Sequence, residues 1–133
     1  VGRRRVKLLL DTCTLLWLTL DADELSDTAR ELLVAPSSEL VVSSASVWEL
    51  AVKRALGRVH FDRPLDEWLA DVREEYGLAS LAIDDESALH LLRLPALHRD
   101  PFDRILVAQA LVHGLAILTP DRAIRDYPAR TIW

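Results

Sequence analysis

The segment Val6-Lys7-Leu8-Leu9-Leu10-Asp11 decides the fold that we expect for this chain. Its apolar residues form a nearly continuous run, which is typical of a parallel strand covered on both faces. Further apolar runs at 40–43, 78–83 and 115–118 predict three more strands, and residues 130–133 are expected to form an edge strand. Helical patterns separate these runs. We therefore predict an α/β fold with a central, mostly parallel sheet and right-handed crossovers.

The segments between the predicted strands carry the signals of helices. Residues 12–20 are rich in leucine, Ser26 is a good N-cap for a helix that ends at Val34, and residues 45–56 stop at Gly57. Further helices are predicted over residues 65–76, 85–93, 101–113 and 120–125. No repeat or linker interrupts this pattern, so we expect residues 1–133 to form a single domain.

The composition limits the classes of protein to which this chain can belong. A net charge of −5 argues weakly against a nucleic-acid substrate, although basic groups at 3–5, 53–54 and 99–104 can still guide phosphates. The single cysteine, Cys13, excludes an intrachain disulfide framework, and we expect it to be a buried small hydrophobic residue. Lys7 interrupts the only stretch that resembles a signal peptide, and no run is long enough to span a membrane. These features predict a cytoplasmic protein without membrane contact.

Five acidic residues stand where a predicted strand ends or a predicted helix begins: Asp11, Glu49, Asp100, Asp103 and Asp121. The carboxyl ends of parallel strands share one edge of a sheet, and ligands bind in the crevice at that edge. Carboxylates gathered there repel one another unless a cation lies between them. Hard divalent cations such as Mg²⁺ and Mn²⁺ prefer oxygen ligands of this kind.

Taken singly, most of these acids also have a structural explanation. The segment Ser46-Val47-Trp48-Glu49 matches a capping box, although a cap at Ser43 or Ser44 would place Glu49 deeper in the helix, where it can pair with Lys53. The segment Asp100-Pro101-Phe102-Asp103 reads as an N-cap, a proline at N1 and an acid at N3, and Thr119-Pro120-Asp121 has the same form.

The acids together favour a metal site over separate caps. Several strand-edge segments each deliver one acid, and Glu49 lies in a setting too apolar for a solvated charge. A divalent ion held by such carboxylates activates water for hydrolysis of a phosphodiester. No zinc, P-loop or dinucleotide motif is present. The four histidines are scattered and are interpreted as surface or packing residues: His60, His90, His113 and His98, which we expect to lie nearest the site.

Four segments in order resemble the motifs of PIN-domain proteins, and most of all those of VapC-type toxins of bacterial toxin–antitoxin pairs. These segments are LLLDTCTLLW (8–17), SSASVWELAVKRALGRV (43–59), HRDPFDRILVAQA (98–110) and LTPDRAIRDY (118–127). The resemblance implies a PIN-like three-layer α/β/α sandwich and an endoribonuclease dependent on Mg²⁺ or Mn²⁺. It also implies a homodimer and inhibition by a cognate antitoxin. The protein would contact DNA only indirectly, through this antitoxin.

The resemblance also implies roles for particular residues. The acidic positions of the family fall on Asp11, Glu49, Asp103 and Asp121, which are expected to bind the metal and to act in catalysis. Residues near the metal, in a second shell, are expected at Thr12, Asp100 and Thr119.

Other functions stay open at this point. One is a flap- or exonuclease-like DNA nuclease, which usually carries more acids and a threading arch. A second is a receiver-type signalling domain, which prefers adjacent acids after its first strand. A third is a non-catalytic protein-binding domain whose acids only cap helices.

The early helices contain more apolar residues than a small domain is expected to bury. These residues are Leu15, Leu16, Trp17, Leu18, Leu20, Leu32, Leu33 and Val34. Leftover apolar patches mark interfaces, so we expect a groove there that accepts a segment of the antitoxin. An arginine or lysine of that segment would reach the acidic pocket and compete with the metal.

Overall fold

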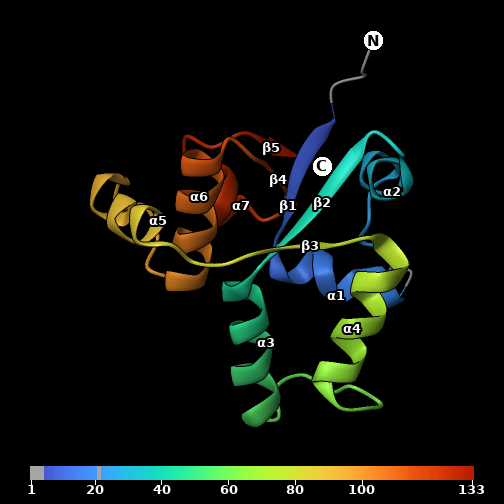
Figure 1. Cartoon of the computed structure of the whole chain (residues 1–133). Helices are drawn as coiled ribbons and strands as arrows, with labels where there is room; N and C mark the ends of the chain where they lie inside the picture. Colours follow the sequence, from blue (N-terminus) through green and yellow to red (C-terminus); the bar gives the residue numbers. More distant parts are fainter. Residues whose placement is uncertain (1–4, 21) are drawn as a thin grey trace.

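A computed structural model describes residues 5–20 and 22–133 (Figure 1). Strands and helices alternate along the chain as the sequence predicts. The elements are β1 (Val6–Leu10), α1 (Thr12–Leu20), α2 (Asp27–Val34), β2 (Ser38–Ser43), α3 (Ser44–Ala55), α4 (Leu65–Tyr76), β3 (Ala79–Leu81), α5 (Asp85–His90), the 3₁₀ helix η1 (Leu91–Arg93), α6 (Pro101–His113), β4 (Ala116–Leu118), α7 (Arg122–Arg125) and β5 (Thr131–Ile132).

The strands form a five-stranded sheet in the order β3-β2-β1-β4-β5, and every neighbouring pair is parallel. The prediction of a mostly parallel sheet is therefore confirmed. The chain runs outward from β1 through β2 and β3, and then crosses to β4 on the other side of β1. This reversal creates a topological switch point between β1 and β4. Receiver domains have the order 2-1-3-4-5 instead, so the sheet does not support the receiver-type alternative.

Helices cover both faces of the sheet, which makes the fold a three-layer α/β/α sandwich (Figure 1). Successive strand residues point to opposite faces. Leu8 and Leu10 of β1 therefore pack in one core cluster with residues of α1, α2 and α4. Leu9 packs in the other cluster with residues of α6 and α7. Burial on both faces explains why the strands are apolar without alternation.

Helix α3 begins at the carboxyl edge of the sheet and extends away from it (Figure 1). Its N-cap is Ser43, whose hydroxyl accepts a hydrogen bond from the Ala45 amide at 3.0 Å. Ala45 belongs to the core cluster of α6, whereas Leu50 belongs to the cluster of α1. The first half of α3 thus contacts both helix layers at the end of the sheet and brings Glu49 to the edge where β1 ends.

Several predicted boundaries need correction. The strand predicted at 78–83 is shorter, because Asp84 caps α5 and the chain turns before it. The helix predicted at 120–125 begins only at Arg122, because Asp121 is itself the N-cap. Cys13 is half-buried rather than fully buried. Arg3 and Arg4 of the basic group at 3–5 lie outside the described residues. Among the helices formed by residues 5–20 and 22–133, none has the length and apolar character to span a membrane.

Candidate active site

Asp11 lies directly after β1, at the switch point of the sheet, and is only 2% exposed. Its Oδ1 atom accepts a hydrogen bond from the Thr14 amide at 2.9 Å. Its Oδ2 atom accepts one from the Thr119 hydroxyl, which follows β4 on the other side of the crevice. A buried carboxylate is costly unless it is paired or hydrogen-bonded. These donors stabilise the charge of Asp11 and hold its side chain in one orientation.

Cys13 completes the surroundings of this carboxylate. Its Sγ atom lies 3.1 Å from Asp11 Oδ2 and donates to it. Burial raises the pKa of the Cys13 thiol far above its ordinary value, and the neighbouring charge of Asp11 raises it further. The thiol therefore stays protonated, which excludes it as a nucleophile at neutral pH.

Glu49 is buried on α3 with both carboxylate oxygens engaged. Oε1 accepts a hydrogen bond from the Thr12 hydroxyl at 2.6 Å, and Oε2 pairs with Lys53 Nζ at 2.7 Å. Because Ser43 is the N-cap, the capping-box interpretation of Ser46 and Glu49 is wrong. The alternative with a Lys53 pair is confirmed. Thr12 at the start of α1 thus connects the first strand edge to the acid of α3.

Asp103 differs from the other acids because its carboxylate makes no hydrogen bond or ion pair with any described residue. It lies half-buried in the first turn of α6. Burial raises the pKa of Asp103 to about 7, and the charges of Asp100, Asp121, Glu49 and Asp11 add to the rise. The four acids predicted from the sequence therefore lie within electrostatic reach of one another, at a single edge of the sheet.

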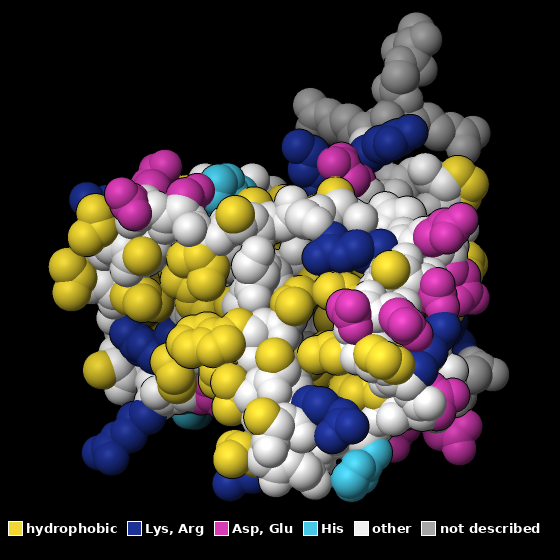
Figure 2. Space-filling view, turned by 60° about the horizontal axis from the view of Figure 1, so that its bottom comes forward, with side chains coloured by type: hydrophobic (Ala, Val, Ile, Leu, Met, Phe, Trp, Pro, Cys, Tyr) yellow, Lys and Arg dark blue, Asp and Glu magenta, His cyan; other side chains and the backbone are white. Residues whose placement is uncertain are grey.

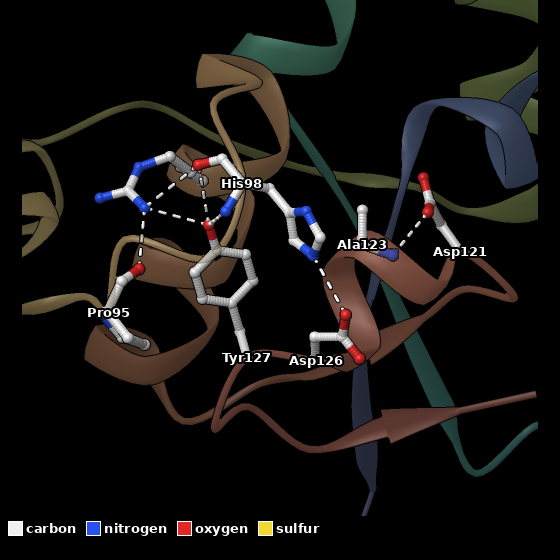
Figure 3. Close-up of polar contacts among 7 residues, drawn as sticks. Pro95, His98, Asp121, Ala123, Asp126 and Tyr127 are labelled. Atoms are coloured by element: carbon white, nitrogen blue, oxygen red, sulfur yellow. Dashed lines mark hydrogen bonds and ion pairs between the residues drawn. The ribbon is translucent and has the colours of Figure 1, made fainter.

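Asp100 and Asp121 both cap helices. Asp100 Oδ1 accepts hydrogen bonds from the Phe102 amide at 2.8 Å and the Asp103 amide at 3.3 Å. Asp121 Oδ1 accepts one from the Ala123 amide at 2.9 Å (Figure 3). For both residues, Oδ2 makes no hydrogen bond within the described chain. A capping role uses only one oxygen, so it leaves the other free for a ligand.

A second polar cluster, not recognised in the sequence, holds the loop that precedes α6 (Figure 3). Arg104 Nη1 donates to the Pro95 carbonyl and to the Tyr127 hydroxyl, both at 3.0 Å. The Tyr127 hydroxyl also accepts from the His98 amide at 3.1 Å, and the His98 ring pairs with Asp126. This cluster ties the start of α6, which carries Asp103, to the residues that follow α7. Its side chains lie in the two motif segments at 98–110 and 118–127, but no local pattern in the sequence indicates that they contact each other.

The residues at this edge fit a hard divalent cation by their chemistry. Asp103 offers an uncompensated carboxylate, and its acidic neighbours add only oxygen ligands. Over residues 5–20 and 22–133, however, no three acidic, histidine or cysteine side chains are grouped as a preformed metal site. Mg²⁺ usually keeps several waters and binds one or two carboxylates directly. A site of that kind does not need three carboxylates in contact with the ion.

Comparison with known proteins identifies the family. The family model of the PIN domain matches residues 8–129. The chain is 29% identical over 120 residues to ribonuclease VapC22 of Mycobacterium tuberculosis (strain ATCC 25618 / H37Rv), with 90% of each protein covered.

Three solved structures share the fold. VapBC2 from Rickettsia felis, bound to a DNA fragment from its promoter, has a TM-score of 0.71 at 12% identity, over 96% of this chain and 98% of that one. DNA-bound VapBC from Salmonella typhimurium has a TM-score of 0.64 at 19% identity (96% and 97% covered), and FitAcB from Neisseria gonorrhoeae one of 0.65 at 17% (95% and 96% covered). The chain therefore belongs to the PIN domain family and is related to the VapC ribonuclease toxins of VapBC toxin–antitoxin systems.

Proposed function

We propose that this protein is a metal-dependent endoribonuclease and acts as the toxin of a toxin–antitoxin pair. The observation that carries the proposal is the unpaired carboxylate of Asp103 among Asp11, Glu49 and Asp121. A structural role for Asp103 alone would not require acids from three other elements at the same edge. The 29% identity to a ribonuclease supports RNA as the substrate.

Each residue at the edge has a proposed part in the reaction. A bound Mg²⁺ or Mn²⁺ ion would lower the pKa of a water and polarise a phosphoryl oxygen. Asp11, oriented by Thr119, and Asp103 would bind the ion, and Asp121 would add its free oxygen. Glu49, held by Thr12 and Lys53, would orient the attacking water. Asp100 would act from the second shell, because its charge contributes to the raised pKa of Asp103.

The proposal is tested by incubating the purified protein with an unstructured RNA in Mg²⁺, in Mn²⁺ and in excess EDTA. We expect cleavage with either ion and none in EDTA, because a hard cation is needed to activate water. Undiminished cleavage in EDTA would refute metal dependence. Equal cleavage of single-stranded DNA would instead favour the DNA nuclease alternative.

The apolar groove expected from the early helices has a counterpart in the structure. Leu16, Trp17 and Leu20 of α1 face Phe61 and Trp68 across a hollow of about 530 Å³, which we call the α1 groove. The remaining apolar residues of these helices divide between core and surface: Leu15, Leu18 and Leu33 are buried, Leu32 is partly buried, and Val34 is exposed.

We propose that a segment of a cognate antitoxin occupies the α1 groove. The related structures are those of VapBC and FitAcB, and in this chain the apolar floor of the groove fits an amphipathic segment. Thr12, at the other end of α1, lies beside Glu49. From Thr12 to Leu20, helix α1 spans roughly 12 Å. A basic side chain of an antitoxin segment in the groove would therefore reach the acids and compete with the metal.

Leu20→Glu is expected to weaken antitoxin binding at least about tenfold, because it places a charge in the apolar groove. Leu20 is 70% exposed, so the fold should be unaffected. Val34→Glu is the matched control, since Val34 is 74% exposed but does not line the groove. Isothermal titration calorimetry of each purified variant with the separately purified cognate antitoxin measures both affinities. Equal affinities for the two variants would contradict this assignment.

We also propose a homodimer through the outer side of α5 and η1. Leu89 and Leu92 are strongly exposed there, beside a hollow that Glu86 and Arg93 also line. Figure 2 shows hydrophobic side chains gathered over this part of the face. In a two-fold contact the same patch meets itself, so Glu86 of one copy would face Arg93 of the other. Light scattering should report a dimer for wild type and a monomer for Leu92→Glu, and a monomeric wild type would exclude the contact.

A further inference from the structure

A hollow of about 400 Å³ lies beside the acids, between the second half of α3 and the start of α6; we call it the α3–α6 hollow. It is continuous with the candidate site, because Glu49 and Asp100 contribute to its lining. Arg58 and Arg99 also line it, from the loops that follow α3 and precede α6. These two residues lie 41 positions apart in the chain numbering, from 58 to 99, and only the fold brings them to one hollow.

Both arginines are exposed, and their guanidinium groups make no hydrogen bond or ion pair with the described residues. Acidic residues outnumber basic ones in the chain, 21 to 16, yet neither of these guanidinium groups is paired with a described acid. The third cation of the hollow, Lys53, is already paired with Glu49. Unpaired guanidinium groups beside an open hollow are well suited to phosphate oxygens, which they bind in a bidentate manner.

The remaining wall of the hollow is apolar. Val52 and Leu56 lie on the exposed side of α3, and Leu56 is 62% exposed. The ring of Phe102 lies on the facing side, where it meets Trp48 edge-on at a centroid distance of 4.9 Å. Basic and hydrophobic side chains adjoin each other on this face of the molecule (Figure 2). Apolar and aromatic surface next to cations is the combination that binds single-stranded nucleic acid, whose bases stack while its phosphates pair.

We propose that the α3–α6 hollow is a nucleotide subsite for the RNA strand on one side of the scissile phosphate. Arg58 and Arg99 bind phosphates of that strand, and one base packs against Phe102 and Leu56. The inference rests on the proposed ribonuclease function and adds to it the path and the single-stranded form of the substrate. Stacking recognises any base, so this subsite contributes affinity and register with little dependence on sequence.

Single-turnover cleavage of a short unstructured RNA in Mg²⁺ tests the phosphate contacts. We expect Arg58→Ala and Arg99→Ala each to lower kcat/KM about tenfold. In each variant, a plot of the logarithm of the RNA association constant against the logarithm of the salt concentration should also be less steep by about 0.7. Arg54→Ala is the matched control, because Arg54 is exposed on the same helix but does not line the hollow. Equal effects of all three substitutions would overturn the subsite and leave the ribonuclease proposal intact.

A second experiment tests the base contact by placing one abasic nucleotide at each position near the cleaved bond. For the wild-type protein we expect an abasic nucleotide at one position to lower the rate of RNA cleavage about tenfold, since a stacked base contributes about 1–3 kcal/mol. Phe102→Leu keeps the apolar bulk and removes the ring, so the abasic penalty at that position should become much smaller. The same penalty at that position in both proteins would contradict the contact.

Binding assays separate this inference from the proposed function. If wild type fails to cut RNA, the ribonuclease proposal fails, and fluorescence anisotropy with the same intact RNA still examines the subsite. Weaker binding by Arg58→Ala and Arg99→Ala than by Arg54→Ala would then support the subsite alone. Competition by a short polyglutamate peptide as strong as that by RNA would assign the hollow to an acidic protein partner and overturn the inference.

Discussion

Asp103→Asn is expected to lower the rate of RNA cleavage in Mg²⁺ by at least about 10²-fold, the range found when a group that handles a proton or a metal-activated water is removed. The reason lies in the surroundings of Asp103. Its carboxylate has no hydrogen-bonding or ionic partner among the described residues, and burial, with the charges of four neighbouring acids, raises its pKa to about 7. A side chain in that state is available to a metal ion and to a proton. Asparagine preserves the shape but offers neither the charge nor the second anionic oxygen.

The matched control for this substitution is Asp66→Asn. Asp66 lies in the first turn of α4, as Asp103 lies in the first turn of α6, but it is exposed and is not among the acids that raise the pKa of Asp103. We expect less than a twofold change in cleavage rate for Asp66→Asn. A comparable, small effect of both substitutions would remove Asp103 from the proposed catalytic set.

The stability of the metal-free protein should increase in Asp103→Asn, which is the opposite of what a helix cap predicts. An acid that only complements the first turn of α6 would cost a few tenths to ~1 kcal/mol on removal, with or without metal. An acid crowded by Asp11, Glu49 and Asp121 carries unrelieved repulsion. After allowance for solvent screening at this half-buried position, we expect a gain of about 1 kcal/mol, or roughly 3 °C in Tm.

The pH dependence of metal-free stability follows from the same shift in pKa. The pKa of Asp103 is about 7 in the folded protein and 3.8 for the ordinary group. Between these values the folded state holds the proton more tightly than the unfolded chain does. The free energy of unfolding should therefore fall as the pH rises from about 4 through about 7, and this fall should be smaller in Asp103→Asn.

Thermal melts of wild type and Asp103→Asn, each in EDTA and in Mg²⁺, measure both effects. An ion that binds only the native state stabilises it, so Mg²⁺ should raise the Tm of wild type more than that of the variant. A variant that melts lower than wild type in EDTA and responds equally to Mg²⁺ would show that Asp103 is a helix cap.

The positions of the acids could be predicted because local patterns determine them. An apolar run followed by Asp11 marks the end of a strand, and Asp100-Pro101 marks the start of a helix; both predictions agree with the structure. The alternative explanations of Glu49 could not be separated in the sequence. Capping depends on which serine the chain uses, and the hydrogen bond from the Ala45 amide to the Ser43 hydroxyl identifies Ser43 as the cap.

The sequence by itself determined the alternation of strands and helices, the sheet edge at which the acids lie and the family to which the chain belongs. These follow from apolar periodicity, helix caps and motifs within short segments. Only the tertiary structure decided which groups meet across that edge. Thr119 bonds to Asp11, and Thr12 bonds to Glu49, over separations of 108 and 37 residues. Such contacts depend on β4 lying beside β1 and on where α3 leaves the sheet, and local patterns do not specify strand order.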